Sequence, residues 1–262
     1  MKNDCKVVIL CGGRGTRLSE ETELRPKPLI EIGGRPILWH IMKTYAAYGF
    51  TDFVLCLGYK GEMIKEYFLN YEAMNNDCTI TLGKKNSIEF HTDHLENGWS
   101  ITLVDTGLDT MTGSRVKKIE PYIDSDCFML TYGDGVADVN VKDLLAFHRA
   151  RKKIGTVTGV HPSSRFGELI IDGGKVISFS EKPQTTNGFI NGGFFIFKKR
   201  IFDYIGKGDQ VYLEREPLEQ LASDGQLAVY LHEGFWQCMD TRRELDLLNR
   251  LWDEGKAPWK VW

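Results

Sequence analysis

The chain has 262 residues, of which 42% are hydrophobic and 26% charged, and it carries a formal net charge of −3. This composition is typical of a globular protein that is long enough to bury a sizeable core. The small acidic excess argues against nucleic acid as a partner, and no apolar run reaches the roughly 18 residues of a membrane-spanning helix. We therefore expect a cytoplasmic protein with no nucleic-acid or membrane partner.

In the first half of the chain, short β-branched runs alternate with helical patterns. Strands are predicted at residues 7–10, 53–57 and 127–131, and helices at 36–48, 61–69 and 141–150. Strands and helices at this spacing indicate a parallel sheet covered on both faces. The six cysteines form no C-x-x-C pair and most lie in apolar runs, so we expect buried reduced thiols.

The second half changes character. Mixed or antiparallel strands are predicted at residues 156–160, 169–171, 176–180 and 189–197, and helices at 213–222 and 242–252. We predict a single α/β domain over 1–262, with a Rossmann-like, mixed but mostly parallel central sheet and helices on both faces. Residues 84–99 are polar and irregular, which fits either an exposed hairpin or an oligomer contact.

A basic, glycine-rich loop follows the first predicted strand, where residues 12–17 read GGRGTR. Glycines let backbone N–H groups approach phosphate oxygens, and ligands of open α/β sheets bind at the carboxyl ends of strands. The loop is not a dinucleotide fingerprint, because Leu18 takes the place of the last glycine. It is not a P-loop either, because Thr16 and Arg17 follow Gly15. It is therefore a different phosphate loop or a simple turn.

Three further residues have chemistry that suits a phosphate site with a bound metal ion. Lys27 lies between two prolines, which stiffen the backbone and favour an ammonium held at a fixed point. Asp134 follows an apolar run and is flanked by glycines, although it could be a turn residue. Asp240 precedes the last predicted helix, where Thr241 and Glu244 already offer a capping box. Two carboxylates with phosphate oxygens are a ligand set that suits Mg²⁺.

These residues carry a resemblance to a known family. The pattern G-G-x-G-T-R-L followed by R-P-K-P-L resembles the signature of the sugar-phosphate nucleotidylyltransferases. Further matches follow in the expected order almost to the end of the chain, at residues 33–38, 133–135, 181–183, 191–193 and 239–241. The resemblance implies a nucleotide-diphospho-sugar transferase fold, with 1–135 mainly binding nucleotide and 136–262 mainly binding sugar phosphate. It also implies Mg²⁺-dependent in-line attack of a sugar phosphate on the α-phosphorus of a nucleoside triphosphate, with release of pyrophosphate.

The resemblance assigns site residues in three groups. The expected nucleotide-binding residues are Leu10, Cys11, Gly12, Gly13, Arg14, Gly15, Thr16, Arg17, Lys27, Thr110, Gly113, Arg115 and Gly133. The expected sugar-phosphate residues are Tyr132, Glu181, Lys182, Asn191, Gly192 and Trp236. Asp134 and Asp240 are the expected Mg²⁺ carboxylates, and Arg17, Lys27 and Lys182 are the expected catalytic residues.

Segments 111–115 and 255–260 are most similar to family members that use CTP and glucose 1-phosphate, whose product CDP-glucose feeds deoxysugars of surface polysaccharide such as lipopolysaccharide O-antigen. A guanidinium only donates hydrogen bonds, so Arg115 can favour cytosine, which accepts at O2 and N3. The alternatives are UTP or dTTP, another phosphorylated acceptor, a metal-dependent glycosyltransferase, or a non-catalytic nucleotide-sugar sensor. A homo-oligomer larger than a dimer is also expected, with a hexamer as the specific candidate.

Overall fold

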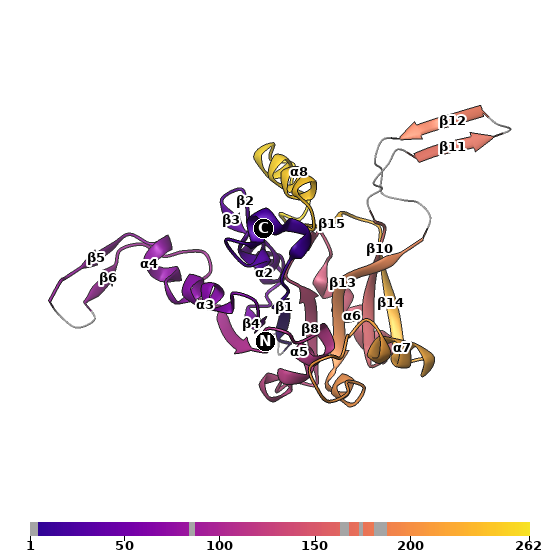
Figure 1. The fold of residues 1–262 in the computed structure, drawn as a ribbon, viewed down its shortest axis with the longest axis horizontal. Coiled ribbons are helices and arrows are strands. Elements are labelled where there is room, and N and C mark those ends of the chain that lie inside the picture. Colours follow the sequence, from indigo (N-terminus) through magenta and orange to yellow (C-terminus); the bar gives the residue numbers. More distant parts are fainter. Residues whose placement is uncertain (1–4, 84–86, 163–167, 173–174, 181–187) are drawn as a thin grey trace.

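The computed structural model describes residues 5–83, 87–162, 168–172, 175–180 and 188–262 (Figure 1). Within these ranges a central seven-stranded sheet has the order β14-β10-β13-β8-β1-β4-β7. In that order the strands are Leu227–His232, Gly155–Val160, Ile190–Lys198, Cys127–Tyr132, Val7–Cys11, Asp52–Leu57 and Ser100–Asp105. Strand β13 runs antiparallel to both of its neighbours, whereas the other pairs are parallel. The predicted mixed, mostly parallel sheet is confirmed.

Smaller elements surround this sheet. The two-stranded sheets pair β2 (Glu31–Ile32) with β3 (Arg35–Pro36), β5 (Cys78–Ile80) with β6 (Ile88–Phe90), β9 (Gly135–Ala137) with β15 (Trp236–Cys238), and β11 (Glu168–Asp172) with β12 (Lys175–Ser180). The α-helices are α1 (Ser19–Thr22), α2 (Ile37–Ala47), α3 (Gly61–Leu69), α4 (Tyr71–Asn75), α5 (Thr112–Lys118), α6 (Val141–Arg151), α7 (Glu216–Ser223) and α8 (Arg242–Asp253). Short 3-10 turns lie at Thr16–Leu18, Lys27–Leu29, Glu120–Tyr122 and Lys199–Asp203.

The sheet separates two hydrophobic cores, as expected for a sheet covered on both faces. Alternate side chains of β1 point to opposite faces: Val7 and Ile9 join the core that also contains residues of α2, α6 and α8. Val8 and Leu10 join the core that contains residues of α5 and α7. Strand β1 is therefore buried on both sides, and its carboxyl end can hold a loop rigidly.

The predicted helices at 61–69, 141–150 and 242–252 are confirmed within one residue, and the last begins with the expected Thr241–Glu244 capping box. The helix predicted over 213–222 is wrong at its start, because α7 begins only at Glu216. Pro217 explains the difference, since a proline is tolerated in the first helical turn and not further inside. Strands β7 and β14 and helix α5 were not predicted.

Two hairpins project from the body in Figure 1. One is β5–β6, which begins before the irregular stretch 84–99 and has only its second strand inside it, and the other is β11–β12. No helix in the described ranges is long and apolar enough to cross a membrane.

Two histidines are fully buried in the cores. His40 on α2 contacts the Ile32 carbonyl through Nε2 at 2.8 Å, and its Nδ1 accepts a hydrogen bond from Trp259 Nε1 at 3.4 Å. His148 on α6 contacts Thr156 Oγ1 at 2.8 Å through Nδ1. Burial lowers the pKa of each imidazole to about 4, so both rings stay neutral in the folded protein at neutral pH.

Because of these two buried histidines, we expect the folded protein to lose stability in acid. Below pH 6.5 the unfolded chain protonates both rings while the folded chain does not, so stability should fall as the pH drops from about 6.5 towards 4. At pH 5 we expect the free energy of unfolding to be lower by about 2 kcal/mol per histidine. Urea unfolding at pH 7.5, 6 and 5 measures this change. His40→Gln should flatten the dependence, whereas His91→Gln, at an exposed histidine of the hairpin, should not. An unchanged slope in His40→Gln would contradict this account.

Candidate active site

The loop after β1 lies at the carboxyl end of the sheet and is packed more tightly than a simple turn. Gly15 has φ +64°, in the left-handed region that favours glycine. A Cβ at Gly12 would lie 2.2 Å from the Arg115 guanidinium. Glycine at position 12 is thus required by a buried side chain from α5, in addition to any close approach of phosphate.

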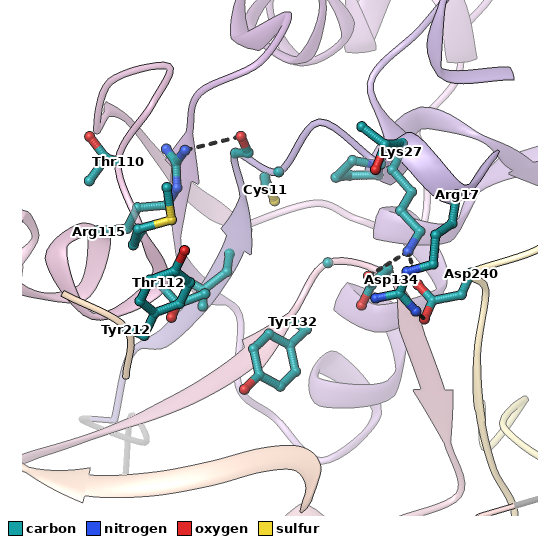
Figure 2. Close-up of a pocket in the computed structure, with 18 residues that line it drawn as sticks. Cys11, Arg17, Lys27, Thr110, Thr112, Arg115, Tyr132, Asp134, Tyr212 and Asp240 are labelled. Atoms are coloured by element: carbon teal, nitrogen blue, oxygen red, sulfur yellow. Dashed lines mark hydrogen bonds and ion pairs between the residues drawn. The ribbon is translucent and has the colours of Figure 1, made fainter. Parts of the chain in front are cut away.

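Lys27 is held where the two predicted carboxylates converge. Its ammonium donates to Asp134 Oδ2 at 2.7 Å and to Asp240 Oδ1 at 2.5 Å (Figure 2), and the residue is only 8% exposed. Burial disfavours its charge, but the two carboxylates outweigh burial and raise the pKa of Lys27. The lysine therefore stays cationic across the physiological range.

Backbone contacts bring the two aspartates together although they are far apart in sequence. Asp134 follows β8, and its carbonyl accepts from the Met239 N–H at 2.8 Å. The Glu244 carboxylate of the capping box accepts from the backbone N–H of Asp240 at 2.7 Å. The Asp240 side chain is left to face Lys27, and Arg17 Nη1 reaches its other oxygen at 2.5 Å.

This carboxylate pair suits a divalent cation. Both side chains already share one positive charge, the Lys27 ammonium, and hard oxygen donors are the ligands Mg²⁺ prefers. Across the described ranges, no three His, Cys, Asp or Glu side chains converge as a cage. Asp134 and Asp240 would thus hold a metal jointly with substrate oxygens and water, as Mg²⁺ sites commonly do.

Two cavities meet at these carboxylates. The first has a volume of about 320 Å³, the second about 220 Å³, and Arg17, Tyr132, Asp134 and Asp240 line both. Of the expected nucleotide-binding residues, the first cavity is lined by Leu10, Cys11, Gly12, Gly13, Gly15, Thr16, Arg17, Lys27, Thr110, Arg115 and Gly133. Of the expected sugar-phosphate residues, the second is lined by Tyr132, Asn191, Gly192 and Trp236.

Of the remaining expected residues, two line neither cavity and two are not described. Arg14 is exposed and pairs with Asp109 at 2.8 Å. Gly113 faces the segment before α7, where a Cβ would lie 2.9 Å from the Val211 carbonyl. Glu181 and Lys182 fall outside the described residues.

Arg115 lies beside the first cavity, but its guanidinium is already engaged by the protein. It donates to the carbonyls of Leu57, Gly107, Gly12 and Leu108 and to Thr106 Oγ1, at 2.7–3.2 Å. These bonds tie the loop after β1 to the ends of β4 and β7. The direct contact with a base stays a prediction.

The sequence missed several residues of the site. Met111, Thr112 and Tyr212 line the first cavity, and Glu214 connects Thr112 to Tyr132. Figure 2 shows Thr110, Thr112, Arg115 and Tyr212 at one end of the cavity, and Arg17, Lys27, Asp134 and Asp240 at the other. Thr112 lies inside the segment 111–115 that carried part of the resemblance, whereas Tyr212 and Glu214 carried no signal.

A glycine-rich loop, a buried lysine and paired carboxylates at the carboxyl ends of a Rossmann-like sheet define a nucleotide-binding α/β enzyme. The family model "Nucleotidyl transferase" matches residues 6–241. The chain therefore belongs to the nucleotidyl transferase family and is a nucleotidyltransferase.

Relatives of known name agree with this assignment. The chain is 50% identical to the glucose-1-phosphate cytidylyltransferase of Salmonella typhi, over 98% of this chain and 99% of that protein. It is 30% identical to the mannose-1-phosphate guanylyltransferase catalytic subunit beta of Dictyostelium discoideum, over 93% of this chain and 63% of that protein. The crystal structure of HddC from Yersinia pseudotuberculosis superposes with a TM-score of 0.70 at 23% identity, over 95% of this chain and 99% of that one, which shows the shared fold.

Removing the lysine between the carboxylates should expose their repulsion. In Lys27→Met the two aspartates lose their shared cation. In the presence of EDTA we expect the free energy of unfolding to fall by about 1–3 kcal/mol relative to the wild type. Millimolar Mg²⁺ should then raise the Tm of the variant more than that of the wild type, because the metal takes the vacated position. Calorimetry with and without Mg²⁺ measures both effects. Lys207→Met, at an exposed lysine, is the matched control, and an equal Mg²⁺ response in all three proteins would argue against a shared carboxylate site.

Proposed function

We propose that this enzyme transfers a cytidylyl group from CTP to α-D-glucose 1-phosphate, giving CDP-glucose and pyrophosphate. The observation that carries the proposal is the 50% identity, over nearly the full length of both chains, to a glucose-1-phosphate cytidylyltransferase. Two adjoining cavities with a common wall of charged residues support it, because the reaction joins two anionic substrates. We also propose that the activity is cytoplasmic.

The proposed chemistry is an in-line displacement. A phosphate oxygen of the sugar forms a bond to the α-phosphorus of CTP, and the bond from that phosphorus to the bridging oxygen of pyrophosphate breaks. A general base is unnecessary, because a phosphate monoester is already ionised near neutral pH. The reaction instead needs fixed positive charge where the two anions approach each other.

The chain supplies that charge from two directions. Lys27 holds an ammonium at the junction of the cavities. We propose that Arg17, which is exposed on the loop and donates to Asp240 in this structure, would contact the triphosphate. Enzymes of this family generally use a divalent metal, and we propose Mg²⁺ held by Asp134 and Asp240, where it would neutralise charge on the phosphates. Lys27 would then turn from the carboxylates towards the α-phosphate.

The second cavity is the proposed sugar site. Trp236 Nε1 donates to the Gly192 carbonyl at 2.8 Å, which fixes the indole against the start of β13. Asn191 and Tyr132 offer polar groups for sugar hydroxyls, and each buried hydroxyl needs such a partner. Lys182 on the sugar phosphate and Glu181 on the sugar remain assigned by family resemblance, as does the division of the chain into 1–135 for nucleotide and 136–262 for sugar phosphate.

The nearest alternative is the same chemistry with another base or sugar. The 30% identity to a mannose-1-phosphate guanylyltransferase shows that a relative named for another base and another sugar shares part of this sequence. We favour CTP because the similarity to the cytidylyltransferase is greater and covers nearly all of both chains.

Pyrophosphate release tests the proposal directly. With Mg²⁺ and glucose 1-phosphate, we expect release with CTP and little with UTP, dTTP, ATP or GTP. Asp134→Asn, which removes charge without volume, should lower the rate at least about a hundredfold while the Tm stays close to that of the wild type. Release with UTP or dTTP at the CTP rate would overturn the assignment of the base, and a fully active Asp134→Asn would overturn the metal site.

We also propose that the chain assembles as a homo-oligomer larger than a dimer, with a hexamer as the specific expectation. Large apolar side chains are exposed on the β5–β6 hairpin and around it, and they are Leu69, Met74, Ile80, Leu82, Ile88, Phe90 and Leu95. A hairpin that extends from the body into solvent (Figure 1) buries such side chains only against another molecule.

Light scattering measures the assembly. The wild type should have a mass above that of a dimer, and the double variant Leu82→Asp, Phe90→Asp should dissociate because two charges would enter an apolar contact. Leu24→Asp, at an exposed leucine outside the hairpin, is the control. A monomeric wild type would refute the proposal.

A further inference from the structure

Glu214 joins a residue that lines the first cavity to a residue that lines both cavities. The half-buried Glu214, in the turn before α7, accepts hydrogen bonds from Thr112 Oγ1 and Tyr132 Oη, each at 2.6 Å. Thr112 is the first residue of α5 and lines the first cavity. Tyr132 ends β8 and lines both cavities.

The turn that carries Glu214 is fixed along the start of α5. Met111 N donates to the Asp209 carbonyl at 2.8 Å, and Ser114 N donates to the Val211 carbonyl at 3.1 Å. The Ser114 hydroxyl accepts from Val211 N at 3.0 Å. This close approach also requires glycine at position 113, where a Cβ would meet the Val211 carbonyl. The Glu214 carboxylate is therefore held at a set place.

A carboxylate sets the direction of both hydrogen bonds. An ionised carboxylate only accepts, and a hydroxyl has one proton to give and two lone pairs to receive. Thr112 and Tyr132 must therefore both direct their protons at Glu214. The remaining contacts agree, because Leu213 N donates to Thr112 Oγ1 at 3.0 Å and Asn191 Nδ2 donates to Tyr132 Oη at 3.3 Å. Each hydroxyl is left with one lone pair and no proton for a ligand.

An acceptor at this end of the cavity distinguishes the pyrimidines. Cytosine carries an exocyclic amino group at C4, which donates, where uracil and thymine carry a carbonyl oxygen, which accepts. Thr112 lies at the end of the cavity opposite the charged residues (Figure 2), where a triphosphate bound at Lys27 would place its base. A donor-only guanidinium such as Arg115 cannot recognise this amino group.

We propose that Glu214 is a positioning residue for base selection, which acts by holding the Thr112 hydroxyl as a hydrogen-bond acceptor for the exocyclic amino group of cytosine. The inference rests on the proposed cytidylyl transfer and names the group that selects its base. The same carboxylate also orients the Tyr132 hydroxyl, which lines both cavities, so this hydroxyl acts as an acceptor as well.

Glu214→Gln tests the polarity while keeping the shape. The amide oxygen should accept from Tyr132, because a phenol is a stronger donor and a weaker acceptor than an aliphatic hydroxyl, so the NH₂ must donate to Thr112. The Thr112 proton is then free to turn towards a ligand. We expect the ratio of kcat/KM for CTP to that for UTP to fall at least about tenfold, with a Tm close to that of the wild type. Glu219→Gln, at an exposed glutamate on α7, should keep the wild-type ratio. A Glu214→Gln ratio within about twofold of the wild type would overturn the proposal.

Thr112→Val provides an independent test, and it decides the matter if Glu214→Gln does not fold. It removes the hydroxyl at nearly constant volume and should lower the same ratio, whereas Thr112→Ser should retain it. An unchanged ratio in Thr112→Val would overturn the inference. Failure of the proposed function is distinguishable, because the wild type would then release no pyrophosphate with CTP. In that case the affinities of CTP and UTP are measured by calorimetry for the wild type and for Thr112→Val. An equal preference for CTP over UTP in the two proteins would overturn the inference.

Discussion

The arrangement of this site depends on one buried ammonium. Lys27 lies between Asp134 and Asp240, which come from the middle and the C-terminal part of the sequence, and without a cation the two carboxylates would repel each other in a half-buried place. The prolines on either side of Lys27 fix its backbone. The hydrogen bond from Met239 to Asp134 joins the residue after β15 to the turn after β8, and the capping box of α8 fixes Asp240. Three separate local structures thus converge on one charge. The junction of the two cavities lies at that same point, so the folded chain keeps its charged groups together before any substrate arrives.

Much of this could be predicted from the sequence because the signals are local. The buried strands β1, β4 and β8 are short continuous apolar runs, and α3, α6 and α8 have clear periodicity and ends. Lys27 was recognisable from its two flanking prolines and Asp134 from its flanking glycines. The capping box of Thr241 and Glu244 accounted for the start of the last helix, so Asp240 was recognisable as a candidate for chemistry. The family patterns, which occur in the expected order along the chain, then predicted that these residues form one site. The carboxyl ends of parallel strands lie at one edge of the sheet, so loops that follow different strands can meet there.

The sequence could not show interactions that depend on long-range packing. Glu214 is an ordinary glutamate in a turn, and its significance appears only when the turn lies against the start of α5. Arg115 has the chemistry of a base reader, yet its guanidinium is surrounded by backbone carbonyls that no local pattern reveals. The start of α7 was misplaced for a simpler reason, because hydrophobic periodicity continued upstream of a proline that limits where the helix can begin. Strand β7 was missed since it lies at the edge of the sheet and is only partly buried.

The reversed strand β13 has a consequence for what the sheet can bring to one edge. A wholly parallel sheet offers a ligand the ends of its strands, together with the loops that leave them. Because β13 runs against β8, its beginning lies where β8 finishes, and Asn191 and Gly192 arrive beside Asp134 from the opposite chain direction. One inverted strand thereby lets incoming and outgoing chain segments face each other across a small gap. A single sheet can thus present the ends of several strands and the beginning of another to the same small space.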